Sequence, residues 1–242
     1  MITLKNITKC YGSSIVIDDL SLLVQSGSTT VLIGPSGCGK STTLKLINGL
    51  VRPEKGSVII NNQNINDYDI FSLRTKIGYV IQDGGLFPHL TAYENVSILA
   101  SYLGWGKQSI SERLGELCEL TKFPSEALNR FPVQISGGQR QRVSLMRALM
   151  LNPDILLMDE PLAALDPLIR YDLQNDLKQI FSTLNKTVIL VTHDINEADF
   201  FGDKIVLIKD GSVVQEGTLK QFVEYPSNSF VTKFISAQRK HF

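Results

Sequence analysis

The 242-residue sequence predicts an α/β protein in which helices cover a mostly parallel β-sheet and antiparallel strands adjoin it. Short β-branched runs alternate along the chain with longer helical patterns, an order typical of parallel sheets. Two of these runs, 155–158 and 187–191, are almost entirely apolar, as strands buried on both faces are. Asp210-Gly211 lies between two apolar runs and indicates a hairpin, which predicts the antiparallel strands.

The individual elements follow from local patterns. The clearest strand candidates are short runs rich in β-branched residues, namely 29–33, 57–60, 77–81, 155–158 and 187–191. Residues 1–6 alternate like another strand, and the Asn-Asn-Gln-Asn sequence at 61–64 predicts a polar turn. From about 91 to 149 the pattern is helical, with breaks near 104–106 and at two prolines, Pro124 and Pro132. We therefore expect a helical subdomain, approximately 91–149, inserted in an α/β core formed by approximately 1–90 and 150–242.

Composition narrows the possible classes of protein. A hydrophobic content of 43% with 20% charged residues is typical of a globular chain that needs no disulfide or metal to build a core. The 24 basic residues balance the 24 acidic ones, so no overall field attracts nucleic acid or anionic lipid. Three dispersed cysteines favour a reducing compartment. The N-terminus lacks a secretion signal, and the uncharged stretch 20–39 is too polar for a membrane span, so we expect a soluble chain.

A phosphate-binding loop is the first chemical motif. The sequence matches GxxxxGK[ST] between a predicted strand and a predicted helix, at residues Gly34, Pro35, Ser36, Gly37, Cys38, Gly39, Lys40 and Ser41. Glycines let successive N–H groups point at phosphate, and the helix N-terminus adds positive potential. Lys40 brings a charge to the outer phosphates, and the Ser41 hydroxyl can ligate Mg²⁺. The alternative, a glycine-rich turn that binds nothing, is disfavoured by the correct flanks. Cys38 is interpreted as a small loop side chain rather than a reactive thiolate.

Polar residues follow three of the predicted strands. Asp159 ends the run 155–158, where it can hold Mg²⁺, and Glu160 is the candidate general base for an attacking water. His193 can donate to a γ-phosphate, and the adjacent Asp194 can cap a helix. Gln82 can reach Mg²⁺ or the water through its amide oxygen. Taken singly, each has an ordinary structural alternative: acids that end a strand before a proline, a structural histidine, and a solvated glutamine.

The stretch from Ile135 to Arg142, Ile-Ser-Gly-Gly-Gln-Arg-Gln-Arg, resembles the signature motif of ATP-binding cassette (ABC) ATPases. Tyr11, the P-loop, Gln82, the signature, Asp159-Glu160, the segment 164–166 and His193 occur in that family's order, so the resemblance covers essentially the whole chain. It departs slightly at Ile135, where leucine is commoner, and at Ala163, where serine is common. The resemblance implies a P-loop NTPase (RecA-like) core with an antiparallel β subdomain and an inserted helical signature subdomain.

The resemblance also implies ATP and Mg²⁺ as cofactors and assigns residue roles. Tyr11 is expected to stack on adenine. The residues expected to surround the phosphates and Mg²⁺ are Lys40, Ser41, Thr42, Gln82 and Asp159. Glu160 is expected to act on water, and His193 to contact the γ-phosphate. From the residues alone, Ser136 can cap a helix whose Gly137 and Gly138 N–H groups bind an anion, or the segment is simply a capped surface helix. The family implies that Ser136, Gly137, Gly138 and Gln139 bind ATP held by a second cassette, with Asp166 reaching across a head-to-tail dimer.

Segments next to Gln82 resemble importer cassettes. Leu-Phe-Pro-His-Leu-Thr at 86–91 carries this likeness, and Tyr-Val-Ile-Gln at 79–82 followed by Gly-Gly-Leu-Phe at 84–87 is similar to the glycine betaine, choline and carnitine group. The implied partners are a second cassette, identical or paralogous, transmembrane permease subunits docking near 86–87, and, indirectly, an extracytoplasmic solute-binding protein, but no nucleic acid. The implied location is the cytoplasmic face of the cell membrane.

Other functions remain open from the sequence. They are import of amino acids or other solutes, export, a non-transport ABC ATPase acting on DNA or the ribosome, and a small-molecule kinase. A compact segment between Lys40 and Ser136 argues against a chromosome-type coiled coil. The sequence ends at Phe242 after a short helical tail, so regulation by an appended domain is not expected.

Overall fold

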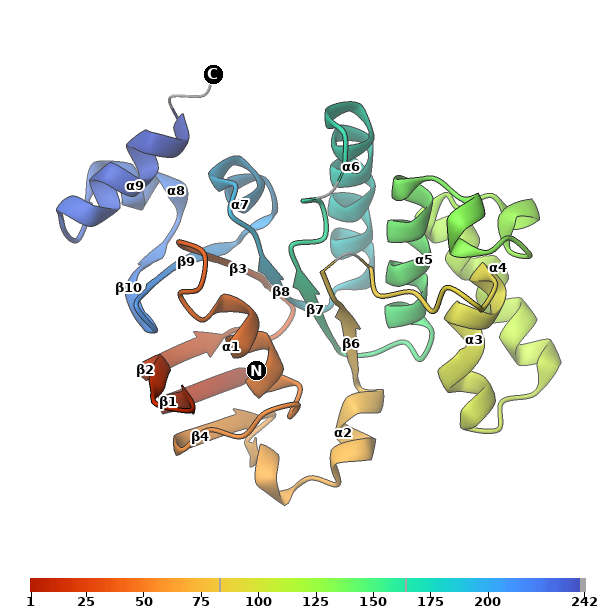
Figure 1. The fold of residues 1–242 in the computed structure, drawn as a ribbon, viewed down its shortest axis with the longest axis horizontal. Helices are drawn as coiled ribbons and strands as arrows, with labels where there is room; N and C mark the ends of the chain where they lie inside the picture. Colours follow the sequence, from red (N-terminus) through yellow and green to blue (C-terminus); the bar gives the residue numbers. More distant parts are fainter. Residues whose placement is uncertain (83, 164, 240–242) are drawn as a thin grey trace. The chain divides into compact units, whose positions relative to one another are not determined.

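The computed structural model describes residues 1–82, 84–163 and 165–239 (Figure 1). Residue 164 of the segment 164–166 and Phe242, both named above, lie outside these residues. The chain divides into two compact units, the first formed by Met1–Arg74 and Lys186–Phe242 and the second by Thr75–Asn185. The second unit covers more of the sequence than the expected helical subdomain at 91–149, because it also contains two parallel strands and the long helix that follows them.

In the first unit, four strands form an antiparallel sheet in the order β2-β1-β4-β5. These strands are β1 (Ile2–Tyr11), β2 (Ser14–Val24), β4 (Lys55–Ile60) and β5 (Gln63–Asn64). The predicted polar turn joins β4 to β5, where Asn61 and Asn62 adopt left-handed φ angles of 49° and 65°. A short 3-10 helix η1 (Ile65–Asp67) and helix α2 (Ile70–Thr75) follow. The antiparallel sheet confirms that the parallel strands are accompanied by antiparallel ones.

The first unit also contains the parallel strands expected around the P-loop. Strand β3 (Thr29–Ile33) pairs in parallel with β8 (Thr187–Val191) on one side and with β9 (Lys204–Lys209) on the other. Every residue of β3 and β8 is buried, which explains why the two strands contain only apolar residues and threonine. The predicted Asp210-Gly211 hairpin is confirmed and joins β9 to β10 (Ser212–Gly217). The helices of this unit are α1 (Lys40–Ile47), α7 (Ile195–Phe201), α8 (Leu219–Glu224) and α9 (Ser229–Arg239).

The second unit combines two parallel strands with a group of helices. Strand β6 (Ile77–Val80) pairs with β7 (Ile155–Asp159) so that Val80 lies opposite Met158. The helices are α3 (Ala92–Tyr102), α4 (Lys107–Thr121), η2 (Ser125–Ala127), η3 (Pro132–Gln134), α5 (Gly137–Leu149) and α6 (Pro167–Leu184). Residues 92–149, all of which the structure describes, contain no strand, and their helices break where predicted. A Cβ atom on Gly78 would lie 2.5 Å from the Ala148 carbonyl oxygen, so glycine lets α5 approach β6 closely.

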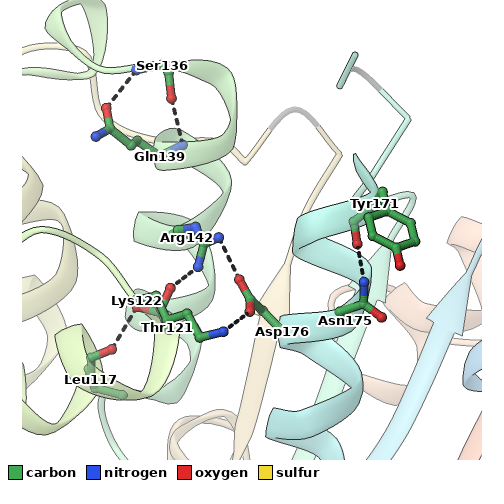
Figure 2. Close-up of polar contacts among 9 residues, drawn as sticks. All are labelled: Leu117, Thr121, Lys122, Ser136, Gln139, Arg142, Tyr171, Asn175 and Asp176. Atoms are coloured by element: carbon green, nitrogen blue, oxygen red, sulfur yellow. Dashed lines mark hydrogen bonds and ion pairs between the residues drawn. The ribbon is translucent and has the colours of Figure 1, made fainter. Parts of the chain in front are cut away.

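A buried carboxylate joins three of these helices. Asp176 of α6 accepts hydrogen bonds from the Lys122 ammonium (Nζ to Oδ1, 2.7 Å) and the Arg142 guanidinium (Nη2 to Oδ2, 2.6 Å). Arg142 also donates to the Thr121 carbonyl oxygen at the end of α4 (Figure 2). Burial raises the pKa of Asp176, but the hydrogen bonds from Lys122 and Arg142 outweigh it, so the pKa falls below its usual value. The network fixes α4, α5 and α6 to one another.

None of the helices in the described part of the chain is both long enough and apolar enough to cross a membrane.

Candidate nucleotide-binding site

The loop at 34–39 connects β3 to α1 and has the strained backbone that phosphate binding requires. Gly34, Gly37 and Gly39 have φ angles of 149°, 79° and 105°, which side-chain-bearing residues rarely adopt. A Cβ atom on Gly34 would lie 2.1 Å from the Ile208 carbonyl oxygen, and one on Gly39 would lie 2.9 Å from that of Val16. Only glycine therefore fits these two positions, and the backbone is curled as the motif predicts.

Lys40 closes this loop. Its side chain is buried, and Nζ donates to the carbonyl oxygens of Gly34 (2.8 Å) and Pro35 (3.0 Å). Helix α1 begins at Lys40 without a side-chain cap and without an acidic residue in its first turn, so its positive end is not neutralised locally. An ammonium, a helix N-terminus and the hydroxyl of Ser41 form a donor set that suits a triphosphate with Mg²⁺.

Cys38 lies inside the same loop. Burial raises the pKa of the Cys38 thiol, although the nearby Lys40 charge lowers it. The thiol is therefore protonated at neutral pH and is not an activated nucleophile. This agrees with the interpretation of Cys38 as a small loop side chain.

His193 is placed at the same edge of the sheet as the P-loop. Strands β3 and β8 run parallel with Leu32 opposite Val191, and the Thr192 N–H donates to the Leu32 carbonyl oxygen (3.2 Å). The segments that follow β3 and β8 therefore leave the sheet at the same edge, and His193 is exposed there. The buried hydroxyl of Thr192 donates to Glu197 (2.6 Å), which fixes the backbone next to His193. Asp194 caps α7 as predicted, accepting from the Asn196 N–H at 2.8 Å.

Tyr11 ends β1 with a ring that is 47% exposed. The Lys9 ammonium lies 5.3 Å from the centroid of this ring. The exposed ring can stack on a planar group. The Lys9 ammonium is itself paired with Glu54 (2.6 Å), so it adds little net charge beside the ring. Thr42 lies in the first turn of α1, two residues after Lys40.

In the second unit, Gln82, Asp159 and Glu160 leave the sheet together. Asp159 is the buried last residue of β7, and Gln82 follows the parallel neighbour β6 by two residues. Burial, with a smaller contribution from the Asp159 charge, raises the pKa of Tyr79 on β6 to about 12. Glu160 has a left-handed φ of 45°, a conformation that costs a non-glycine residue about 1–3 kcal/mol and is common at functional sites.

The signature segment begins α5 with a reciprocal cap. The Gln139 N–H donates to Ser136 Oγ (3.2 Å), and the Ser136 N–H donates to Gln139 Oε1 (3.0 Å), as Figure 2 shows. The predicted cap is confirmed. A Cβ atom on Gly138 would lie 2.6 Å from Cγ2 of Ile169, so the signature packs tightly on the start of α6. Asp166 caps α6 by accepting from the Ile169 N–H (3.1 Å), which places it beside the signature glycines.

Comparison with known proteins decides between the families that carry a P-loop. A family model described as ABC transporter matches residues 17–163, a range that contains the P-loop, Gln82, the signature and Asp159-Glu160. The chain belongs to the ABC transporter family. This resemblance, inferred above from the motifs, is thereby confirmed.

The cassette is similar to ATP-binding proteins of osmoprotectant transport. It is 44% identical over 240 residues to the choline transport ATP-binding protein OpuBA of Bacillus subtilis, covering 99% of the cassette and 63% of that protein. It is 43% identical over 245 residues to the osmoprotectant import ATP-binding protein OsmV of Salmonella typhimurium, covering 99% and 64%. The chain thus spans a little under two thirds of the length of these curated relatives.

Solved cassettes share its fold. The dimeric structure of an ATP-binding cassette in a post-hydrolysis state, bound to ADP and Pi, superposes with a TM-score of 0.82 at 38% identity, covering 90% of this chain and 99% of the other. A dimeric bacterial ABC transporter cassette gives the same TM-score at 39% identity and the same coverages. The predicted fold class is confirmed.

Within the cassette, the structure thus groups the predicted residues in two sets. The first unit holds Tyr11, the P-loop and His193, and the second holds Gln82, Asp159, Glu160, the signature and Asp166. Sequence reasoning missed the hydroxyl of Thr192 and the carboxylate of Glu197, which support His193, because no motif marks a pair of this kind.

Proposed function

We propose that the cassette binds and hydrolyses ATP to drive import of quaternary-amine osmoprotectants such as choline or glycine betaine. The observation that carries the proposal is the closed P-loop, in which buried Lys40 spans the Gly34 and Pro35 carbonyl oxygens ahead of an uncapped helix. The similarity to choline and osmoprotectant transport proteins over nearly the whole chain supports the substrate class.

Nucleotide binding exchanges contacts within the loop for contacts to phosphate. The Lys40 ammonium leaves the two carbonyl oxygens and pairs with the outer phosphates, while the N–H groups at the start of α1 donate to them. Ser41, Gln82 and Asp159 supply hydroxyl, amide and carboxylate oxygens, the ligands that suit Mg²⁺. When bound, Mg²⁺ would neutralise charge on the phosphates. The exposed ring of Tyr11 stacks on the adenine.

Hydrolysis follows from the position of Glu160 after β7. Its carboxylate accepts a proton from water as the water oxygen bonds to the γ-phosphorus, and the bond to the β–γ bridging oxygen breaks to leave ADP. The exposed imidazole of His193 donates a hydrogen bond to a γ-phosphate oxygen. The left-handed φ of Glu160 is a costly conformation of the kind found at functional sites, which supports this role.

The signature completes the site of a second copy. Ser136, Gly137, Gly138 and Gln139 present the start of α5 to the γ-phosphate bound by the partner chain, and Asp166 beside them reaches across the same interface. Two chains in head-to-tail pairing then enclose two ATP molecules. Closure on ATP and opening after hydrolysis drive the permease subunits, with which the cassette associates at the cytoplasmic face of the membrane. An extracytoplasmic binding protein delivers the solute.

The test compares Glu160→Gln with the exposed control Glu119→Gln on α4. Glu160→Gln is expected to lower ATP turnover by about 10²- to 10⁴-fold while ATP affinity is retained, because only the base is lost. The control should match the wild type. Undiminished turnover in Glu160→Gln would refute the assigned base.

Solute and direction need a transport assay. Vesicles containing the cassette, its permease subunits and the binding protein should take up choline or glycine betaine only with ATP on the cassette side. Uptake of amino acids instead, or ATP-driven efflux, would contradict the proposed substrate class or direction.

A further inference from the structure

Gln82 lies in a turn between strand β6 and a segment that is bound to neighbouring helices. The Gly84 N–H donates to the Ile81 carbonyl oxygen (3.0 Å), so exposed Gln82 lies at the corner of a turn that begins at the end of β6. The residues after the corner, Gly84 and Gly85, have left-handed φ angles of 74° and 54°. The segment before Gln82 follows directly on β6, and the groups that bind Gly84 and Gly85 hold the segment after it.

Two residues of α5 bind the backbone of Gly84 and Gly85. The buried Ser144 hydroxyl donates to the Gly84 carbonyl oxygen (2.8 Å), and Arg147 donates through Nη2 to the same oxygen (2.8 Å) and through Nη1 to that of Gly85 (2.8 Å). Burial lowers the pKa of Arg147 below its usual value. A planar guanidinium can serve two successive carbonyl oxygens at once, which a lysine ammonium does less well.

The rest of the loop is held from α3. Asn95 is fully buried, its Nδ2 donates to the carbonyl oxygens of Phe87 (3.1 Å) and Leu90 (3.0 Å), and its Oδ1 accepts from the Phe87 N–H (2.8 Å). The Arg147 guanidinium also lies 6.0 Å from the centroid of the Phe87 ring. The segment from Gly84 to Leu90 is thus bound to two neighbouring helices along its length.

We propose that Ser144 and Arg147 are positioning residues that set the conformation of the Gln82 turn from α5. The inference rests on the proposed function, in which Gln82 reaches Mg²⁺ or the attacking water. The same helix begins at the signature, and Arg147 lies eleven residues after Ser136, about 16 Å along the axis. Helix α5 therefore connects the signature at its start with the Gln82 turn near its end.

The hydrogen bonds from Ser144 and Arg147 to Gly84 and Gly85 are called the anchor. The first test measures, without nucleotide, how strongly the anchor protects the segment 84–91 from amide hydrogen exchange. Arg147→Lys should speed amide hydrogen exchange in the segment 84–91 about tenfold, since the paired hydrogen bonds to Gly84 and Gly85 are lost. Arg113→Lys is the matched control, because Arg113 donates to the Leu149 carbonyl oxygen (3.0 Å) at the same end of α5 as Arg147 but makes no hydrogen bond to Gly84 or Gly85. Ser144→Ala is the second variant if Arg147→Lys does not fold. Unchanged exchange in the segment would overturn the anchor.

The second test asks whether the anchor acts through Gln82. Arg147→Lys should raise the Mg²⁺ concentration for half-maximal ATP turnover several-fold in a chain with Gln82, and should add no further change in a Gln82→Ala chain. An equal change in both backgrounds would overturn the positioning role. Absence of turnover in the wild type would instead refute the proposed function, and the exchange comparison would still decide the anchor.

Discussion

Replacing Asp176 by Asn tests how the helices around the signature are held together. Asp176 is the acceptor shared by Lys122 and Arg142, and its side chain is 8% exposed (Figure 2). The replacement keeps the size of the side chain and removes its charge. Arg142 keeps its bond to Thr121, so the change isolates the ionic part of the network.

The expected loss of stability follows from the exposure of the two partners. The Arg142 side chain is 16% exposed, and a charge-assisted hydrogen bond of this kind contributes about 1.5–3 kcal/mol. The Lys122 side chain is 63% exposed, so its bond contributes about 0–1 kcal/mol. The Asn oxygen retains one neutral hydrogen bond worth about 1 kcal/mol. The net decrease in the free energy of unfolding is therefore about 0.5–3 kcal/mol.

The assay is urea denaturation at several pH values. Because folding lowers the pKa of Asp176, its contribution is present above the unfolded-state pKa of about 3.9 and is lost as the pH falls through the folded value. The difference between wild type and Asp176→Asn should thus be constant from about pH 8 to 5 and shrink below about pH 4. Glu224→Gln, which breaks an exposed 3.9 Å pair with Lys220, should change nothing. Equal midpoints for Asp176→Asn and wild type at pH 7 would refute the reasoning.

Two further predictions concern the P-loop. Lys40→Ala should weaken ATP binding at least tenfold, since the charge that pairs with phosphate is lost, and an unchanged affinity in a calorimetric titration would contradict its role. Gly34→Ala should disrupt the loop, because the added Cβ would lie 2.1 Å from the Ile208 carbonyl oxygen. Its ATP affinity and thermal midpoint should both fall, whereas Gly115→Ala, at a position in α4 with open space, should keep the affinity and should not lower the midpoint, because alanine favours a helix more than glycine does. Wild-type behaviour of Gly34→Ala would show that the loop can relax.

The sequence predicts best those features that depend on neighbouring residues. Strands β3 and β8 were predicted with the bounds observed, because both are short runs rich in β-branched residues, which favour strands. The caps at Ser136 and Asp194 follow from side chains that bond backbone groups two or three residues away. Strand β2 was not predicted, because register shifts break the β1–β2 pairing and Asp19 adopts a left-handed φ of 49°.

Features that join distant segments could not be predicted from sequence alone. Arg147 reaches the carbonyl oxygen of Gly84 across 63 residues, and Arg142 reaches Asp176 across 34. Neither pair forms a sequence motif. The backbone carbonyl oxygen that Arg147 binds has no sequence signature, and the sequence does not distinguish the buried ion pair of Arg142 with Asp176 from an exposed one. The strained φ of Glu160 likewise depends on the turn that follows β7 and not on its residue type.

The central claim is that one chain's signature completes the ATP site of another. Light scattering of Glu160→Gln with Mg²⁺ and ATP measures this most directly. We expect twice the mass of one chain with ATP, and the mass of a single chain when Ser136→Arg is added. A single-chain mass in both cases, or a dimer that Ser136→Arg leaves intact, would contradict it.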